Sequence, residues 1–203
     1  TSGNYSNSLT SGSQLMKLLN SGAWWNGTRG SYYNNSTTAT TVNFTNYKLS
    51  DKAKSYITTS RYYLGGSLGS AVTTGTIYEV YERGIKRYNN ERPLYWEGMV
   101  GLMYPSDYGY AAGNTCVNGT ILVEYNGGCM NKDWLYNSSN VDWFMSPSTV
   151  NSNLVLYNPG VQGVITNAHS DYPCSVRPTF YLTSNTLITN GDGSIDNPYL
   201  IGL

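Results

Sequence analysis

Charged side chains are scarce in this chain of 203 residues. Asp, Glu, Lys and Arg make up only 12% of it, against about 25% in a typical soluble domain. There is one histidine, and no apolar run is long enough to form a membrane-spanning helix, which needs about 18 residues. A surface with so few charges must be hydrated by amides and hydroxyls. The 20 tyrosines and 22 glycines, together with many Asn and Ser residues, are typical of extracellular modules and binding faces.

Cysteine is also rare, with only Cys116, Cys129 and Cys174 present. No C-x-x-C spacing occurs, and a single histidine cannot complete a zinc-binding set, so structural zinc is not expected. Cys116 and Cys129 flank two turn sequences, NGT and NGG. A disulfide between them would close a loop of about 13 residues and contribute about 3 kcal/mol. The alternative is two buried thiols in a reducing compartment.

The net charge of zero conceals an asymmetry. Residues 1–100 carry ten Lys and Arg against five Asp and Glu, a balance of +5, whereas residues 101–203 carry two against seven, a balance of −5. The basic residues of the first half are scattered, and those at 83–87 lie among glutamates. This pattern does not predict a nucleic-acid partner.

Two short helices are predicted early in the chain. The first covers 13–20, with its three leucines on one buried face, and the second begins after Ser50 as N-cap and stops before Gly65. The stretch 22–41 is too rich in Gly, Asn and Thr to predict a regular element.

Short strands are predicted later in the chain. Residues 76–84 fit either a strand or a short helix, and 96–104 fit a strand. Further short apolar runs occupy 121–125, 154–157, 161–165, 180–182 and 198–201. Early helices followed by many short strands predict a loop-rich α+β fold with mostly antiparallel pairing.

A series of motifs runs along the chain in a characteristic order. They are QLMKLLN, LSDKAKSYI, YEVYERG, GLMYPSDYGYA, NKDWLYNSS, WFMSP, SVRPTFYL and NGDGSIDNPYLI. This order resembles a family of uncharacterised surface proteins from Firmicutes and uncultured gut bacteria, and the resemblance covers essentially all of 1–203. GLMYPSDYGYA and VRP-x-x-YL are its most specific parts. Some members of that family follow a secretion signal, and others follow a prepilin-like helix.

The second half also resembles, more loosely, the C-type-lectin-like fold of formylglycine-generating-type domains and bacterial variable proteins. In that fold a Trp-x-x-Ser-Pro element leads into a variable segment, and a Gly-x-Arg-Pro strand closes the domain. The matching residues here are Trp143, Ser146, Pro147, Arg177 and Pro178. Ser175 stands where such domains usually carry glycine. The resemblance implies that the five matching residues form a structural frame. It also implies a single domain over 1–203, with strands or an anchor segment ahead of Thr1.

The same resemblance places ligand contacts between Ser146 and Arg177, where family members differ most. The polar and aromatic residues there are Asn151, Asn153, Tyr157, Asn158, Asn167, His169, Asp171 and Tyr172. It implies a non-catalytic, adhesin-like module at the bacterial cell surface that binds a protein or glycan through these side chains. Loop variation without any ligand is the simpler reading of the segment. The alternative function is a structural subunit of a pilus-like filament or surface layer, built from copies of the chain.

Neither catalysis nor a cofactor is expected. His169 adjoins Ser170 and Asp171, but adjacency in sequence is not the geometry of a catalytic triad. Cys174 has no second histidine to activate it, and the reactive cysteine pair of formylglycine-generating enzymes is not evident. Arg177 is expected to pair with a carboxylate, either Asp107 or Asp142.

The tail NGDGSID spaces polar residues two apart, as calcium loops do. These residues are Asn190, Asp192, Ser194 and Asp196. A glycine at the sixth position and a following bidentate Glu are both missing. A turn leading into the last strand is therefore predicted, and a calcium site is left open.

Overall fold

The computed structural model describes residues 14–33, 38–66, 72–83, 94–125, 127–148, 154–158, 165–169, 172–194 and 196–202. The predicted contacts Asn151, Asn153 and Asp171 lie outside these ranges, as does most of the strand predicted over 161–165. Tyr157 and Asn158 are described at the level of the backbone, in strand β8.

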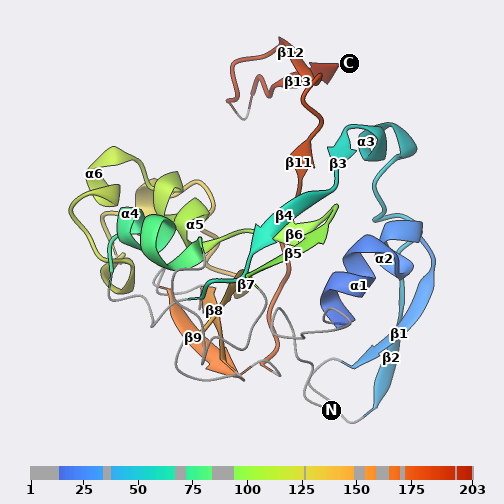
Figure 1. Ribbon diagram of the computed structural model, residues 1–203, viewed down its shortest axis with the longest axis horizontal. Helices are drawn as coiled ribbons and strands as arrows, with labels where there is room; N and C mark the ends of the chain where they lie inside the picture. The colour runs from blue at the N-terminus through green and yellow to red at the C-terminus, as the bar shows by residue number, and fades with distance from the viewer. Residues whose placement is uncertain are drawn as a thin grey trace.

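The α+β class is confirmed: short helices are combined with short antiparallel strands (Figure 1). The helices are α1 (Gln14–Asn20), α2 (Ala23–Asn26), α3 (Asp51–Ser55), α4 (Thr74–Thr76), the π-helix η1 (Ile77–Glu82), α5 (Pro105–Ala111), α6 (Asn114–Val117) and the 3-10 helices η3 (Leu122–Glu124) and η4 (Met130–Lys132). None of the helices in the described ranges is long and apolar enough to cross a membrane.

The strands form small sheets. They are β1 (Arg29–Tyr33), β2 (Ala39–Asn43), β3 (Ile57–Thr58), β4 (Ser60–Tyr63), β5 (Tyr95–Gly98), β6 (Gly101–Leu102), β7 (Asp142–Pro147), β8 (Leu154–Asn158), β9 (Thr166–His169), β10 (Pro178–Thr179), β11 (Tyr181–Leu182), β12 (Leu187–Asn190) and β13 (Leu200–Gly202). Strands β7, β8 and β9 form a three-stranded antiparallel sheet. The other described strands associate in pairs, namely β1–β2, β3–β11, β4–β5, β6–β10 and β12–β13.

Three predictions for the first third of the chain need correction. Helix α1 buries Met16 and Leu19 rather than all three leucines. The stretch 22–41 is not irregular, because it holds α2 and most of the β1–β2 pair, whose Thr and Val residues favour strands. Ser50 does cap α3, with its Oγ accepting a hydrogen bond from the Ala53 N–H at 3.0 Å. That helix nevertheless ends at Ser55, and the chain continues as β3 and β4.

The middle of the chain departs from the predictions in a similar way. Of the residues 76–84, predicted as a strand or a short helix, Ile77–Glu82 adopt the helical alternative as η1. The strand predicted over 96–104 is interrupted between β5 and β6. Residues 121–125, predicted as a strand, contain the 3-10 helix η3. Apolar runs this short do not distinguish strand from helix by periodicity alone.

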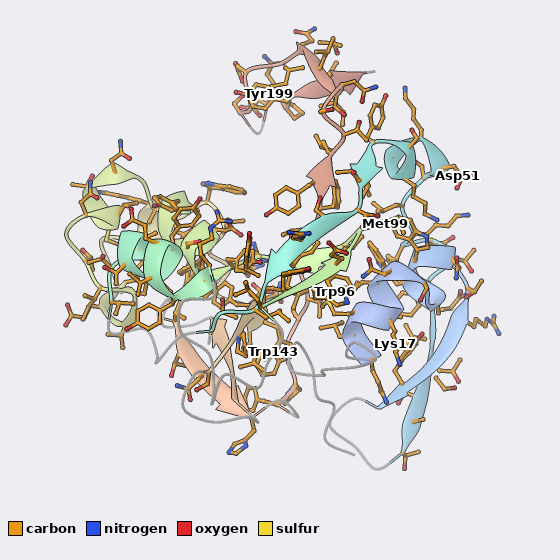
Figure 2. The ribbon with its side chains drawn as sticks, in the orientation of Figure 1. Lys17, Asp51, Trp96, Met99, Trp143 and Tyr199 are labelled. Atoms are coloured by element: carbon orange, nitrogen blue, oxygen red, sulfur yellow. A yellow bond between two sulfur atoms is a disulfide. The ribbon has the colours of Figure 1, made fainter. Side chains whose placement is uncertain are left out.

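Strand β7 is buried on both faces and separates two hydrophobic clusters. Alternate residues of a strand point to opposite sides. Phe144 therefore packs with Tyr108 and the helices α5 and α6, while Trp143 and Met145 pack with α1, β4 and β6. Figure 2 shows Trp143 near the centre of the molecule, below the β4–β5 pair.

The predicted disulfide between Cys116 and Cys129 is present, with the two Cα atoms 5.7 Å apart. It joins α6 to the loop before η4, and Cys116 lies within the cluster around Phe144. Cys174 is a free, half-buried thiol, and burial raises its pKa to about 12. A thiol that stays protonated at neutral pH is a poor nucleophile.

Candidate ligand-binding groove

A groove of about 630 Å³ opens between α5 and the strands β10 and β11. Six of its thirteen described lining residues are aromatic, and we call it the aromatic groove: Tyr62, Met103, Tyr104, Asp107, Tyr110, Ala111, Trp134, Leu135, Arg177, Pro178, Thr179, Phe180 and Tyr181. Trp134 is 78% exposed, and Tyr110 and Tyr181 are each almost half exposed. Exposed aromatic rings gathered in one concavity are typical of a binding site rather than of a core.

The floor of the aromatic groove is Tyr62, which is fully buried on β4. Its ring lies against Gly101 so closely that a Cβ there would come within 2.4 Å of it, so strand β6 needs glycine at this position. The Tyr62 hydroxyl lies within hydrogen-bonding distance of two carbonyl oxygens, 3.2 Å from that of Met99 and 3.3 Å from that of Thr179. The ring centroid of Tyr181 is 5.5 Å from that of Tyr62. Tyr62 therefore holds the C-terminal strands against the centre of the molecule.

Helix α5 forms one wall. It begins with Pro105, and the Asp107 carboxylate accepts a hydrogen bond from the Tyr104 N–H at 2.7 Å, which satisfies a free donor at the helix start. The Tyr104 hydroxyl donates to the Tyr63 carbonyl at 3.1 Å, which ties this wall to β4. Tyr110, one turn further along the helix, faces the groove with its ring exposed.

Trp134 stands on the turn after η4. The buried Asp133 accepts a hydrogen bond from the Leu135 N–H at 2.8 Å through its carboxylate, and its carbonyl accepts one from the Tyr136 N–H at 3.1 Å. An Asx turn of this kind fixes the backbone on either side of the intervening residue. Asp133 thereby presents the exposed indole of Trp134 to the groove. Burial raises the pKa of Asp133 to about 7.

Arg177 pairs with Asp142 rather than with Asp107, the other carboxylate considered. The Nε of Arg177 lies 3.0 Å from Oδ2 of Asp142, which is buried at the start of β7. Asp142 itself is held beside the C-terminal segment, since the Trp143 N–H donates to the Ser175 carbonyl and the Ser175 N–H to the Val141 carbonyl. Burial raises the pKa of Asp142, and the charge of Arg177 opposes that rise. The guanidinium thus enters the groove with its charge largely compensated.

The side chain of Glu82 stabilises the start of α5. Its buried carboxylate accepts hydrogen bonds from the N–H and the hydroxyl of Ser106, at 2.9 and 2.5 Å. Burial raises the pKa of Glu82 from 4.5 to about 7. The folded protein therefore keeps a proton there that the unfolded chain releases, so stability falls as the pH rises through this interval.

Replacing Glu82 with glutamine is expected to remove this part of the pH dependence. Between pH 4.5 and pH 7 the free energy of unfolding of Glu82→Gln should rise relative to wild type by about 3 kcal/mol, since one pKa unit corresponds to about 1.4 kcal/mol. Urea denaturation of both proteins at the two ends of this range provides the measurement. A constant difference between them would contradict the assignment. The other buried carboxyls are common to both proteins and cancel.

Three of the residues predicted to contact ligand, Asn167, His169 and Tyr172, have described side chains and lie outside the groove lining. Asn167 and His169 are on β9, opposite Leu156 and Leu154 of β8, and project from the same face of that strand. Tyr172 follows β9, and its N–H donates to the His169 carbonyl at 2.9 Å. In Figure 1 strands β8 and β9 lie below α5 and away from β11. These three residues are not among those lining the aromatic groove, so their role as ligand contacts stays a prediction.

The residues predicted as a structural frame are all packed. Trp143, Ser146 and Pro147 are buried in β7, while Arg177 and Pro178 are half-buried beside the groove. The polar tail forms the expected turn between β12 and β13, where Asp192 accepts a hydrogen bond from the Ser194 N–H at 2.9 Å. Within the described part of the chain no group of three or more His, Cys, Asp or Glu residues is placed to hold a metal ion.

The aromatic groove was not predicted, although all of its described lining residues except Tyr62 belong to three of the quoted motifs. GLMYPSDYGYA supplies Tyr104, Asp107 and Tyr110, NKDWLYNSS supplies Trp134, and SVRPTFYL supplies residues 177–181. The available signal was the high content of aromatic side chains in these motifs, which does not show which of the rings are exposed.

Comparisons with known proteins add no relative. No family model matches the chain, and no curated protein or solved structure is significantly similar to it.

Proposed function

We propose that this chain is a non-catalytic ligand-binding module whose contact surface is the aromatic groove. The observation that carries the proposal is the set of exposed rings held in fixed positions around one concavity. Trp and Tyr provide large contact areas at a low cost in conformational entropy, which makes them frequent energetic centres of binding sites.

The polar groups of the groove favour a ligand without strong charge. Arg177 is paired with Asp142, and Asp107 accepts a hydrogen bond from the start of its own helix. A charged ligand would have to compete with these contacts. A neutral glycan, or an uncharged protein segment with apolar faces, would instead stack on Trp134, Tyr110 and Tyr181 and use the remaining hydrogen-bonding capacity at the rim.

The wider setting we propose is the bacterial cell surface and a C-type-lectin-like fold. The Cys116–Cys129 disulfide and the low content of charged residues support an extracellular location. The sequence resemblance supports the fold, through Trp143, Ser146, Pro147, Arg177 and Pro178. The order in which β7 leads into β8 and β9 before the segment with Arg177 closes the domain agrees with that proposal.

The test is binding of the purified chain to intact bacterial and epithelial cells. Trp134→Ala should weaken binding at least tenfold, because a central aromatic contact contributes about 2 kcal/mol or more. Val123→Ala shortens an exposed apolar side chain outside the groove and should leave binding unchanged. Treating the cells with periodate or with protease distinguishes a glycan from a protein ligand. Unaltered binding by Trp134→Ala would overturn the proposal.

A further inference from the structure

Two two-stranded ribbons lie apart from each other at the periphery of the molecule. The C-terminal ribbon is β12–β13, which projects at the top of Figure 1, and the N-terminal ribbon is β1–β2, which lies at the lower right. Among the described strands neither ribbon pairs with a third one. Figure 2 shows Tyr199, the residue before β13, far from Trp143 at the centre.

The C-terminal ribbon carries large apolar side chains on both faces. Ile188 pairs with Ile201, and Leu187 pairs with Gly202, so the neighbours Ile188 and Leu187 point to opposite sides. Leu187 and Ile188 are 62% and 63% exposed, and Leu200 is 56% exposed. An isolated two-stranded ribbon is marginally stable in water. The outer edge of this apolar ribbon pairs with no other described strand and is a template for pairing with a further strand.

The N-terminal ribbon is open in the same way. Every residue of β2 is exposed. Val42, which pairs with Gly30, shows its side chain to solvent, and the Ser31 and Thr41 hydroxyls meet across the pair at 3.3 Å. This ribbon is mainly polar, so burial of its own surface does not require a partner. Among the described strands, none pairs with the outer edges of this ribbon.

The chain segments that contain the two ribbons carry charges of opposite sign. Residues 1–50 contain Lys17, Arg29 and Lys48 and no acidic residue. Residues 178–203 contain Asp192 and Asp196 and no Lys, Arg or His. Two C-terminal ribbons would repel each other, whereas unlike ribbons attract, and charge complementarity of this kind selects the partner and its orientation.

We infer that the C-terminal ribbon of one copy docks edge to edge on the N-terminal ribbon of a second copy. Backbone hydrogen bonds would extend the two ribbons into one sheet, in the manner of strand addition. The contact is head to tail, so each pair of copies keeps one free ribbon at either end and further copies can add. Strands of three to five residues make a small interface, and association should be weak and concentration-dependent.

The experiment is sedimentation velocity of the full chain over a range of protein concentrations. Ile188→Lys puts a positive charge on the C-terminal ribbon, where it would face the basic N-terminal ribbon of the next copy. Val42→Glu puts a negative charge on the N-terminal ribbon, where it would face the acidic C-terminal ribbon. Val123→Lys is the matched control, since Val123 is 40% exposed on η3. Circular dichroism melting establishes that all variants are equally folded.

We expect the apparent mass of wild type and of Val123→Lys to rise with concentration and to fall back when salt is added. Each ribbon variant alone should remain monomeric. An equal mixture of the two should associate again, because one intact ribbon of each kind remains and the two introduced charges are opposite in sign. A wild type that is monomeric throughout would overturn the inference. Self-association of Val42→Glu alone would show that two C-terminal ribbons pair with each other. Self-association of Ile188→Lys alone would show that the copies associate through a surface other than the C-terminal ribbon. Either result would also overturn it.

Discussion

Replacing Tyr62 with alanine is expected to lower the free energy of unfolding by about 3–5 kcal/mol, the usual cost of removing a buried aromatic side chain. Tyr62 is 1% exposed, and its ring contacts those of Trp96 and Tyr181. Its hydroxyl lies within reach of the Thr179 carbonyl. The variant would lose both the packing of the core and the support for the segment that carries Arg177.

Tyr62→Phe is the control, because it removes only the hydroxyl. Its expected cost is about 1 kcal/mol, the net contribution of a typical hydrogen bond. Denaturation in guanidinium chloride measures both variants. If Tyr62→Ala cost no more than Tyr62→Phe, the ring would not be the support of the groove floor.

Removing Arg177 should destabilise the protein about as strongly. Arg177→Met keeps the length of the side chain but leaves Asp142 buried beside no positive charge, which typically costs about 3–5 kcal/mol. The loss should shrink at low pH, since Asp142 can then take up a proton. Burial raises the pKa of Asp142 even in the wild type, and removal of the guanidinium raises this pKa further. Folded Arg177→Met therefore binds the proton of Asp142 more tightly than the unfolded chain does. Stability of the variant therefore falls as the pH rises from acid to neutral.

The double variant Arg177→Met with Asp142→Asn, together with the two single variants, completes a double-mutant cycle. It should be more stable than Arg177→Met alone at neutral pH, because no uncompensated charge remains. Strictly additive losses would show that Arg177 and Asp142 do not act as a pair. A role of Arg177 in contacting a bound ligand would then be the better explanation.

The parts of the fold that could be predicted from the sequence depend on local chemistry. Ser50 as a helix cap, the turn before β13 and the bridge between Cys116 and Cys129 each rest on residues close together in the chain. The helix continuing towards Gly65 was wrong, because β3 and β4 gain partners from β11 and β5, which are distant in sequence. Tertiary pairing of this kind overrides local propensity.

The aromatic groove could not be predicted for the same reason. Its walls come from four separate segments, brought together by the pairing of β10 with β6 and of β11 with β3. Nothing local to Trp134 and Trp143 indicates that the first is exposed and the second buried. The polar segment before Arg177 attracted attention because its composition is that of a binding face, and composition does not reveal which side chains share a concavity.

The most direct test of the account compares the two candidate surfaces in one cell-binding experiment. One variant replaces Tyr110, Trp134 and Tyr181 of the groove with alanine, and the other replaces Asn167, His169 and Tyr172. All six side chains are at least partly accessible, so both proteins should fold, which melting curves verify. The account predicts that the groove variant loses binding to intact cells and that the other variant keeps it. Loss of binding only in the variant at 167, 169 and 172 would contradict the account and return the contact surface to the segment before Arg177.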